Sequence, residues 1–254
     1  MALIVQKFGG TSLADPERIR RAASRVQKAV QQGNQVVVVV SAMGHTTDRL
    51  LAQAEELCER PSARELDMLL VTGEQVAASL FAIALQAHDV PSVSLTGALA
   101  GIRTEADHGN AQICKIDPAR IHAELQQGKV AIVTGFQGVT EQGDPTTLGR
   151  GGSDTSAVAL AAALGAELCE ICTDVDGVYT ADPREVPSAQ KIEFLTYDEM
   201  MEMAVLGAVV LHPRAVETAK LHRVPVIVRS SFHDGHGTQI GMEPKRLQSV
   251  SEGV

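Results

Sequence analysis

A lysine, two glycines and two hydroxyl residues stand together near the amino terminus, in the run Lys7-Phe8-Gly9-Gly10-Thr11-Ser12. Paired glycines let backbone N–H groups approach a phosphate closely, and the adjacent lysine adds a positive charge. The lysine precedes the glycines, so the run is not a Walker A loop, and it does not match G-x-G-x-x-G. Two interpretations stay open for this run alone: a phosphate cradle, or a tight strand-to-helix turn with a solvent-facing lysine.

A second glycine-rich segment, Gly149-Arg150-Gly151-Gly152-Ser153-Asp154, leads into a very apolar run that has the pattern of a buried helix. The start of such a helix offers free amides and the positive end of the helix dipole. Arg150 adds a planar fork that suits a carboxylate or phosphate, while Asp154 could be no more than a helix N-cap. Two glycine-rich anion cradles in one chain are far more specific than either alone.

A third segment runs from Thr173 to Arg184 and follows a strand-like stretch. Its acidic residues Asp174 and Asp176 could suggest a cation site, but they lack the spacing of an EF-hand loop. Without further context the segment is a long turn, and Tyr179 and Arg184 are ordinary loop residues.

The elements that must position these turns alternate along the chain. Strands are expected at 3–8, 36–40, 92–95, 130–134, 168–173 and 225–229, and helices near 16–33, 46–59, 64–87, 117–127, 154–164, 197–206 and 213–222. Such alternation predicts an α/β fold in which a mostly parallel central sheet lies between helices, a three-layer αβα sandwich. Open sheets of this kind bind ligands at the carboxyl ends of their strands, where the three turns stand. Segment 141–145 is expected to form a hairpin or loop.

Composition narrows the functional classes. The chain has 254 residues, with 22 Lys+Arg against 31 Asp+Glu, which gives a net charge of −9. Its apolar and charged fractions are ordinary for a globular protein, so a chain that is disordered over its whole length is excluded. The acidic balance and the 3% of aromatic residues argue against a nucleic-acid partner. No signal peptide is evident, and no apolar stretch approaches the ~20 residues of a membrane span, so no membrane partner is expected.

The four cysteines are interpreted as plain thiols. Cys169 and Cys172 form a C-x-x-C pair inside a strand-like run, which is weak evidence for zinc without a second pair. Buried or half-buried thiols in a reducing, cytoplasmic setting are expected instead. His45, His108 and His212 are expected to be polar loop or helix-end residues and not metal ligands.

Seven segments occur in a recognisable order. They are VQKFGGTSL, VVVVSAMGHTTDRLL, LLVTGEQ, HGNAQI, GFQGVT, TTLGRGGSDTSAVALAAALGA and CTDVDGVYTADPR. Together they resemble the catalytic domain of bacterial aspartate kinases, in the amino acid kinase superfamily, from about residue 3 to residue 240. The combination of KFGGTS with GRGGSD is highly specific, whereas relatives such as N-acetylglutamate kinase share only the general layout.

The resemblance implies phosphoryl transfer from Mg·ATP to L-aspartate, giving ADP and 4-phospho-L-aspartate, the first step toward lysine, threonine and methionine. A carboxylate is already a nucleophile, so catalysis would consist mainly of positioning and charge neutralisation. The implied partners are ATP and L-aspartate, with Mg²⁺ carried by ATP and no metal site in the protein. A homodimer or higher homo-oligomer is also implied.

The same resemblance assigns site residues. Lys7 would bridge phosphoryl oxygens and Asp154 would orient Lys7 and the metal-nucleotide. The implied nucleotide-binding residues are Lys7, Phe8, Gly9, Gly10, Thr173, Asp174, Tyr179 and Arg184. The implied aspartate-binding residues are Ser41, Thr47, Glu74, Arg150, Gly151, Gly152 and Ser153. Glu74 would take the ammonium group and Arg150 the α-carboxylate, although Glu74 by itself would pass for a carboxylate on a helix face.

Two departures from the family pattern matter. Val209 stands where a lysine that contacts the nucleotide is expected, a loss that could weaken ATP binding by ~10- to 100-fold. The sequence also predicts a catalytic domain over 1–240 and a polar tail over 241–254, without the C-terminal ACT domains of aspartate kinases. Two alternatives therefore stay open: a kinase for another acidic amino acid or analogue, and a non-catalytic nucleotide-binding homologue.

Overall fold

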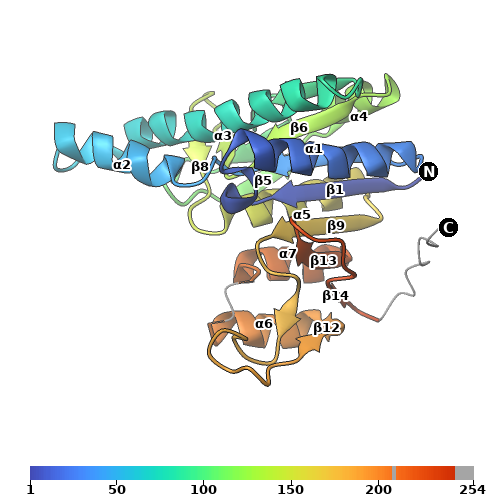
Figure 1. Cartoon of the computed structure of the whole chain (residues 1–254). Helices are drawn as coiled ribbons and strands as arrows, with labels where there is room; N and C mark the ends of the chain where they lie inside the picture. Colours follow the sequence, from blue (N-terminus) through green and yellow to red (C-terminus); the bar gives the residue numbers. More distant parts are fainter. Residues whose placement is uncertain (208–209, 244–254) are drawn as a thin grey trace.

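A central sheet of eight strands forms the middle layer of the molecule (Figure 1). The computed structural model describes residues 1–207 and 210–243, so the prediction about Val209 lies outside the described residues. The strands are β1 (Leu3–Phe8), β2 (Gln35–Val40), β3 (Ser92–Leu95), β6 (Val130–Thr134), β9 (Leu168–Thr173), β12 (Phe194–Thr196), β13 (Val226–Ser230) and β14 (Thr238–Gly241). Their order is β12-β14-β13-β9-β1-β2-β6-β3, and β13–β14 is the antiparallel pair. The predicted, mostly parallel sheet is confirmed.

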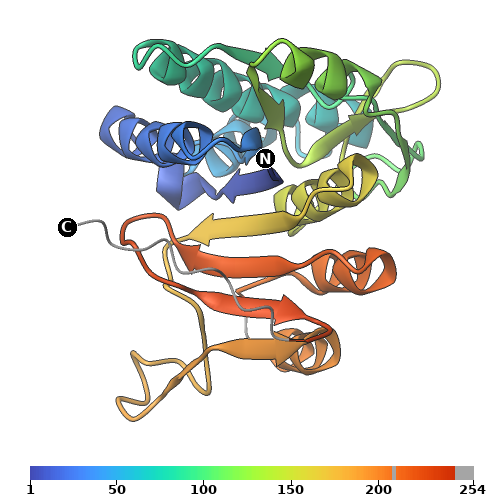
Figure 2. The same cartoon turned by 90° about the vertical axis from the view of Figure 1, so that its right-hand side faces the viewer.

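Helices cover both faces of this sheet. They are α1 (Pro16–Gln31), α2 (Thr46–Leu57), α3 (Ala63–Gln86), α4 (Ala119–Gln126), α5 (Gly152–Leu164), α6 (Tyr197–Val205) and α7 (Pro213–His222). One apolar core joins the sheet to α1 and α3, and a second joins its other face to α4, α5, α6 and α7. Figure 2 shows α1 on one side of the strands and α5 and α7 on the other. The predicted three-layer αβα sandwich is confirmed.

Shorter strands complete the fold. A second sheet has the order β5-β4-β7-β8, formed by β4 (Ile102–Thr104), β5 (Ile113–Ile116), β7 (Gln137–Val139) and β8 (Pro145–Thr147). A two-stranded ribbon pairs β10 (Val178–Tyr179) with β11 (Lys191–Ile192). The antiparallel pairing of β7 with β8 confirms the hairpin expected around 141–145. This hairpin delivers the chain to the second glycine-rich segment.

Local sequence signals explain where the main elements begin. Five consecutive valines of β2, at 36–40, are almost fully buried, because this central strand is covered on both faces. Asp15 caps α1 by accepting a hydrogen bond from the amide of Arg18, and proline follows at the first helical position. Thr196 and Glu199 form the predicted capping box of α6. Gly241 is the last residue of β14, so the predicted polar tail begins inside a strand.

Helix α3 corrects the prediction that no segment is long and apolar enough to span a membrane. It has 24 residues, and a window within it reaches a mean hydropathy of 1.7, with half of that window buried inside the fold. It packs against α1, α2, β3, β6 and β8, and two carboxylates on it, Asp67 and Glu74, are buried. Length and composition alone are weak evidence for a membrane span, and this packing accounts for the buried apolar residues of α3, whereas Val76 and Ile83 are exposed.

The C-x-x-C pair on β9 is split by the sheet. Cys169 belongs to the core that contains Val5, and Cys172 to the core that contains Phe8. Residues three apart on a strand point to opposite faces, so these two thiols cannot share a metal or a disulfide. The interpretation of Cys169 and Cys172 as buried thiols is confirmed.

Thiol reactivity should follow this burial. Burial raises the pKa of Cys172 to about 12 and also raises that of Cys169. Cys58 and Cys114 are exposed, so the expectation of buried or half-buried thiols is wrong for these two. We therefore expect a thiol reagent to titrate two cysteines in the native protein and all four in denaturant. A count of three or four fast thiols in the native state would contradict the structure.

Candidate active site

The two glycine-rich turns meet at the carboxyl ends of the central strands through an ion pair. Lys7 leaves β1 and its ammonium Nζ lies 2.7 Å from Oδ1 of Asp154, in the first turn of α5. Their side chains are only 11% and 15% exposed. A Cβ added to Gly9 would lie 3.5 Å from that ammonium. The structure thus brings together the two residues predicted to be catalytic, in a setting where charges interact more strongly than in water.

The first turn also packs against the loop between β2 and α2. A Cβ on Gly10 would lie 2.7 Å from the carbonyl oxygen of Ala42, so only glycine fits there. The amide of Gly44 donates a 2.9 Å hydrogen bond to the carbonyl of Gly10. Since this loop carries Ser41 and leads to Thr47 in the first turn of α2, two predicted aspartate-binding residues stand beside the phosphate turn.

The second glycine turn leaves the start of α5 open. Gly151 is the N-cap, with a φ of 69° and no side-chain cap, and a Cβ there would clash with the ring of His212. Asp154 therefore lies inside the first turn, and the alternative that it is merely the N-cap is wrong. Within the described residues, the amides of Ser153 and Asp154 find no acceptor. The turn offers the free N–H groups that an anion requires.

Arg150 is exposed on this turn and makes no hydrogen bond or ion pair inside the described part of the chain. The strand end before it is held firmly by a residue that the sequence analysis did not single out. Arg214, in the first turn of α7, donates to the carbonyls of Leu148 at 2.7 Å and Ala111 at 3.1 Å, and to Asn110 Oδ1 at 3.2 Å. The loop that carries Arg150 is thus held in place, and the N–H groups of the Arg150 guanidinium are free to bind an anion.

Glu74 is buried in α3 with half of its carboxylate unsatisfied. Its side chain is 2% exposed, and Oε1 accepts a 3.0 Å hydrogen bond from the amide of Ala42. Oε2 is buried without a partner among the described residues. Burial raises the pKa of Glu74 to about 7. A buried carboxylate oxygen of this kind is costly unless a donor, best a cation, comes to it.

A cavity of about 910 Å³ lies beside the turn between Thr173 and Arg184. Four of the predicted nucleotide-binding residues line it, namely Thr173, Asp174, Tyr179 and Arg184. The Tyr179 hydroxyl donates to Asp176 Oδ1 at 2.8 Å, and the exposed Arg184 pairs with Asp182 at 2.8 Å. Met203, Leu206 and Val210 give the cavity an aliphatic side, which suits a purine base in a chain with few aromatic rings.

Phe8 differs from the other predicted nucleotide-binding residues. Its side chain is fully buried, and its ring centroid lies 5.5 Å from that of Phe81 on α3, with the two rings tilted by 38°. The ring faces the core because the side chains of a strand alternate between faces, and Lys7 faces the other side. Any contact between Phe8 and a nucleotide would therefore be through its backbone.

Residues 2–230 match the model of the amino acid kinase family. The chain belongs to this family. The aspartokinase of Geobacillus stearothermophilus is 59% identical over 250 residues, which cover 98% of this chain and 61% of that protein. The chain thus spans about three fifths of the length of this relative.

Solved structures agree with this membership in the amino acid kinase family. The crystal structure of aspartate kinase from Synechocystis has a TM-score of 0.85 and 53% identity, over 96% of this chain and 41% of that one. E. coli aspartokinase III, solved in complex with aspartate and ADP, has a TM-score of 0.86 and 30% identity, over 96% of this chain and 65% of that one.

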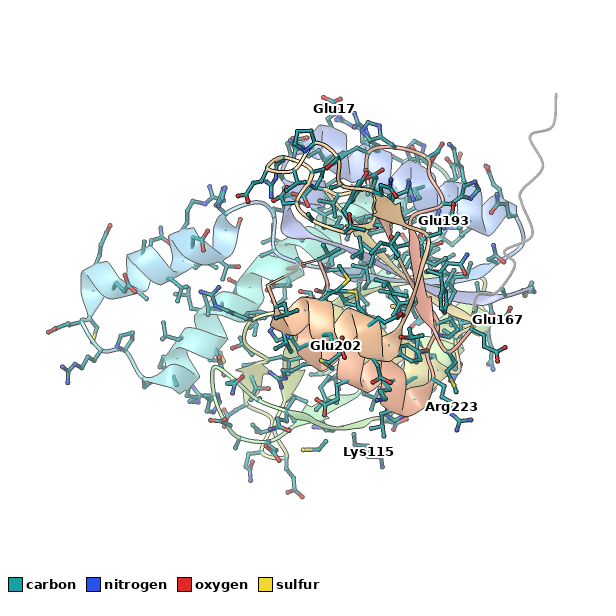
Figure 3. The ribbon with its side chains drawn as sticks, turned by 90° about the horizontal axis from the view of Figure 1, so that it is seen from below. Glu17, Lys115, Glu167, Glu193, Glu202 and Arg223 are labelled. Carbon is teal, nitrogen blue, oxygen red and sulfur yellow. The ribbon has the colours of Figure 1, made fainter. Side chains whose placement is uncertain are left out.

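The charge around this amino acid kinase site contrasts with the rest of the surface. Figure 3 labels the exposed carboxylates Glu17, Glu167, Glu193 and Glu202, together with the basic residues Lys115 and Arg223. The chain as a whole carries a net charge of −9, so Lys7, which pairs with Asp154, and Arg150 are cations at the glycine turns of an acidic protein.

The histidines of the motif regions have structural contacts. His212 is the N-cap of α7, His45 occupies the position before α2, and His108 Nδ1 lies 2.8 Å from Asp67 on α3. The prediction that they are loop or helix-end residues is confirmed. The described residues contain no group of three or more His, Cys, Asp and Glu side chains that could hold a metal ion.

Proposed function

We propose that the chain, over 1–240, is the catalytic region of an aspartate kinase that transfers the γ-phosphoryl group of Mg·ATP to the side-chain carboxylate of L-aspartate. The observation that carries this proposal is the Lys7–Asp154 pair at the junction of two glycine turns, with the unsatisfied carboxylate of Glu74 on α3, which covers the other face of the sheet. The similarity to aspartokinases over nearly the whole chain supports it.

Phosphoryl transfer to a carboxylate needs no general base, since the acceptor is already ionised at neutral pH. The protein must instead align two anions and neutralise the charge between them. Lys7 supplies a mostly buried positive charge, and Asp154 fixes its position from α5. The free amides at the start of α5 and the turn at Gly9–Gly10 surround the same place.

Mg²⁺ would enter with ATP, where it neutralises phosphate oxygens. Asp154 pairs with Lys7 and Asp174 lines the cavity after β9, and each suits one contact to a nucleotide-bound ion better than a complete ligand set. These residues therefore fit a metal that the substrate carries. The protein's own residues would hold Lys7 in position against the phosphate groups of the nucleotide.

The substrate's α-amino and α-carboxylate groups find complementary charges. We assign its ammonium group to the free oxygen of Glu74 and its α-carboxylate to the guanidinium of Arg150. Ser41, Thr47 and Ser153 complete the polar surroundings. An acceptor without the ammonium group would leave Glu74 buried and unpaired, which favours free amino acids over N-acylated ones.

Aspartyl hydroxamate should form when the chain is incubated with Mg·ATP, L-aspartate and hydroxylamine, because hydroxylamine traps the acyl phosphate. We expect the rate with L-glutamate and with N-acetyl-L-aspartate to be lower by at least about 100-fold, since each would misplace the carboxylate or leave Glu74 without a cation. ADP release, measured in parallel with each candidate acceptor, detects phosphoryl transfer to acceptors other than aspartate. A preference for any acceptor other than aspartate would replace this proposal by the alternative of a specialised amino acid kinase, and no release with any would favour the non-catalytic homologue.

We further propose that the chain forms a homodimer or higher homo-oligomer in the cytoplasm, as its resemblance to aspartate kinases implies. Size-exclusion chromatography with light scattering tests the assembly. A monomer at the concentrations used for the assay would contradict this part of the proposal while leaving the catalytic part intact.

A further inference from the structure

Thr134 carries a buried hydroxyl group that nothing in the described chain satisfies. The residue ends β6, is 1% exposed, and its Oγ1 has no hydrogen-bond partner among the described residues. Most buried hydroxyl groups do have partners, because an unpartnered one loses its bonds to water without compensation. This group therefore needs a physical explanation.

The sheet register places this hydroxyl on the α3 side. Thr134 is the Cα partner of Val40 in the parallel pair β2–β6, and partners in neighbouring strands point to the same face. Val40 belongs to the core formed with α1 and α3. The hydroxyl of Thr134 thus lies under α3, at the end of the sheet where the glycine turns stand.

The carboxylate of Glu74 reaches the same corner from α3. Its Oε1 accepts a hydrogen bond from the amide of Ala42, two residues beyond Val40. Its Oε2 is also buried without a partner among the described residues. The residue after Thr134 contacts the site as well, because a Cβ on Gly135 would lie 3.0 Å from both Cβ and Oγ of Ser153.

Glu74 Oε2 and Thr134 Oγ1 can both accept a hydrogen bond from the same cationic donor. A carboxylate accepts hydrogen bonds and attracts positive charge, and a threonine hydroxyl can accept as well as donate. An ammonium group has three donors and one positive charge, so it can serve both oxygens together. A phosphate or carboxylate would be repelled by Glu74.

We infer that Thr134 is a further substrate-binding residue whose hydroxyl accepts a hydrogen bond from the α-ammonium group that Glu74 neutralises. The inference rests on the proposed function, since it takes aspartate as the substrate. It gives each of two buried, unsatisfied oxygens a partner in the complex. It also makes the amino group, and not only the carboxylates, a determinant of substrate choice.

The isosteric variant Thr134→Val tests this role, with Thr134→Ser as the matched control that restores the hydroxyl. We expect Thr134→Val to weaken the binding of L-aspartate about 10-fold, measured by calorimetry, and Thr134→Ser to stay close to the parent. Succinate, which lacks the ammonium group, should bind the parent and Thr134→Val with equal affinity. Without ligand, Thr134→Val should melt at the same or a higher temperature, because it removes an unsatisfied polar atom.

The remaining outcomes separate the inference from the proposed function. Unchanged aspartate affinity in Thr134→Val would overturn the inference and leave the hydroxyl as a group that water satisfies. An equal loss for aspartate and succinate would also overturn it, because the effect would then be general to the pocket. If the parent chain bound no aspartate, both proposals would be wrong. If the parent bound aspartate and Thr134→Val bound it equally well, only the role of Thr134 would be wrong.

Discussion

Replacing Lys7 with alanine is expected to lower the rate of hydroxamate formation by at least about 10³-fold. The ammonium of Lys7 is largely buried, is fixed by Asp154 and stands beside the phosphate turn. A charge held in this way stabilises the transferring phosphoryl group without reorganisation during the reaction. Steady-state assays with saturating ATP and aspartate would measure the loss as a fall in kcat.

The matched control is Lys28→Ala, which removes the same charge from a side chain that is 69% exposed. It should keep parental turnover, because its field at the site is screened by solvent. Lys7→Ala also leaves Asp154 without its partner, so its thermal unfolding and ATP binding must be measured beside its activity. A folded Lys7→Ala protein with turnover near the parent would show that the phosphoryl group is stabilised elsewhere.

The long elements of this fold follow from local sequence. The valine run of β2 and the helical spacing of α1 and α3 extend far enough to show their period, and Asp15 and Thr196 mark helix starts. The strands from β10 to β12 have only two or three residues each. Such segments carry too little pattern to be predicted, because they exist only through pairing with distant partners.

The site was predictable in its parts but not in its contacts. The glycine turns and Lys7 stand out by residue type, whereas the contact of Asp154 with Lys7 is implied only by the resemblance to aspartate kinases, because residue types alone leave open that Asp154 is an N-cap. Arg214 and Thr134 carry no motif signal of their own, and their roles depend on which carbonyls or oxygens the fold brings beside them. Glu74 by residue pattern alone would pass for a surface carboxylate; the resemblance singles it out, and its burial gives the physical reason.

Replacing Glu74 with glutamine is expected to weaken aspartate binding by about 10- to 100-fold at pH 8, because the amide keeps the shape of the side chain and loses its charge. ATP affinity should change little, since Glu74 lies on α3, away from the cavity beside Tyr179. Calorimetry with each ligand separates the two effects. An equal loss for both ligands would mean that the substitution disturbs the fold.

The same variant should be more stable than the parent without ligand, and increasingly so as the pH rises. Burial raises the pKa of Glu74 from 4.5 to about 7, so folding favours the protonated form. Below pH 4.5 the group is protonated in both states, and between pH 4.5 and 7 the unfolded chain releases the proton first. Stability is therefore lost over this window, by roughly 3 kcal/mol at most. Glutamine removes the loss, so the difference in Tm between variant and parent should be small at pH 5 and largest at pH 8.

Glu124 provides the opposite control on α4. Hydrogen bonds from Lys129 and Arg120 lower the pKa of this buried carboxyl, so Glu124→Gln should destabilise the protein at pH 8.

Aspartate should also bind the parent more weakly as the pH falls below about 7, when Glu74 takes up a proton, and this dependence should vanish in Glu74→Gln. A difference in Tm that stays constant from pH 5 to 8 would show that Glu74 is ionised throughout. Oε2 of Glu74 would then need a hydrogen-bond or charge partner already in the ligand-free protein, and the ammonium group of the substrate would no longer be that partner.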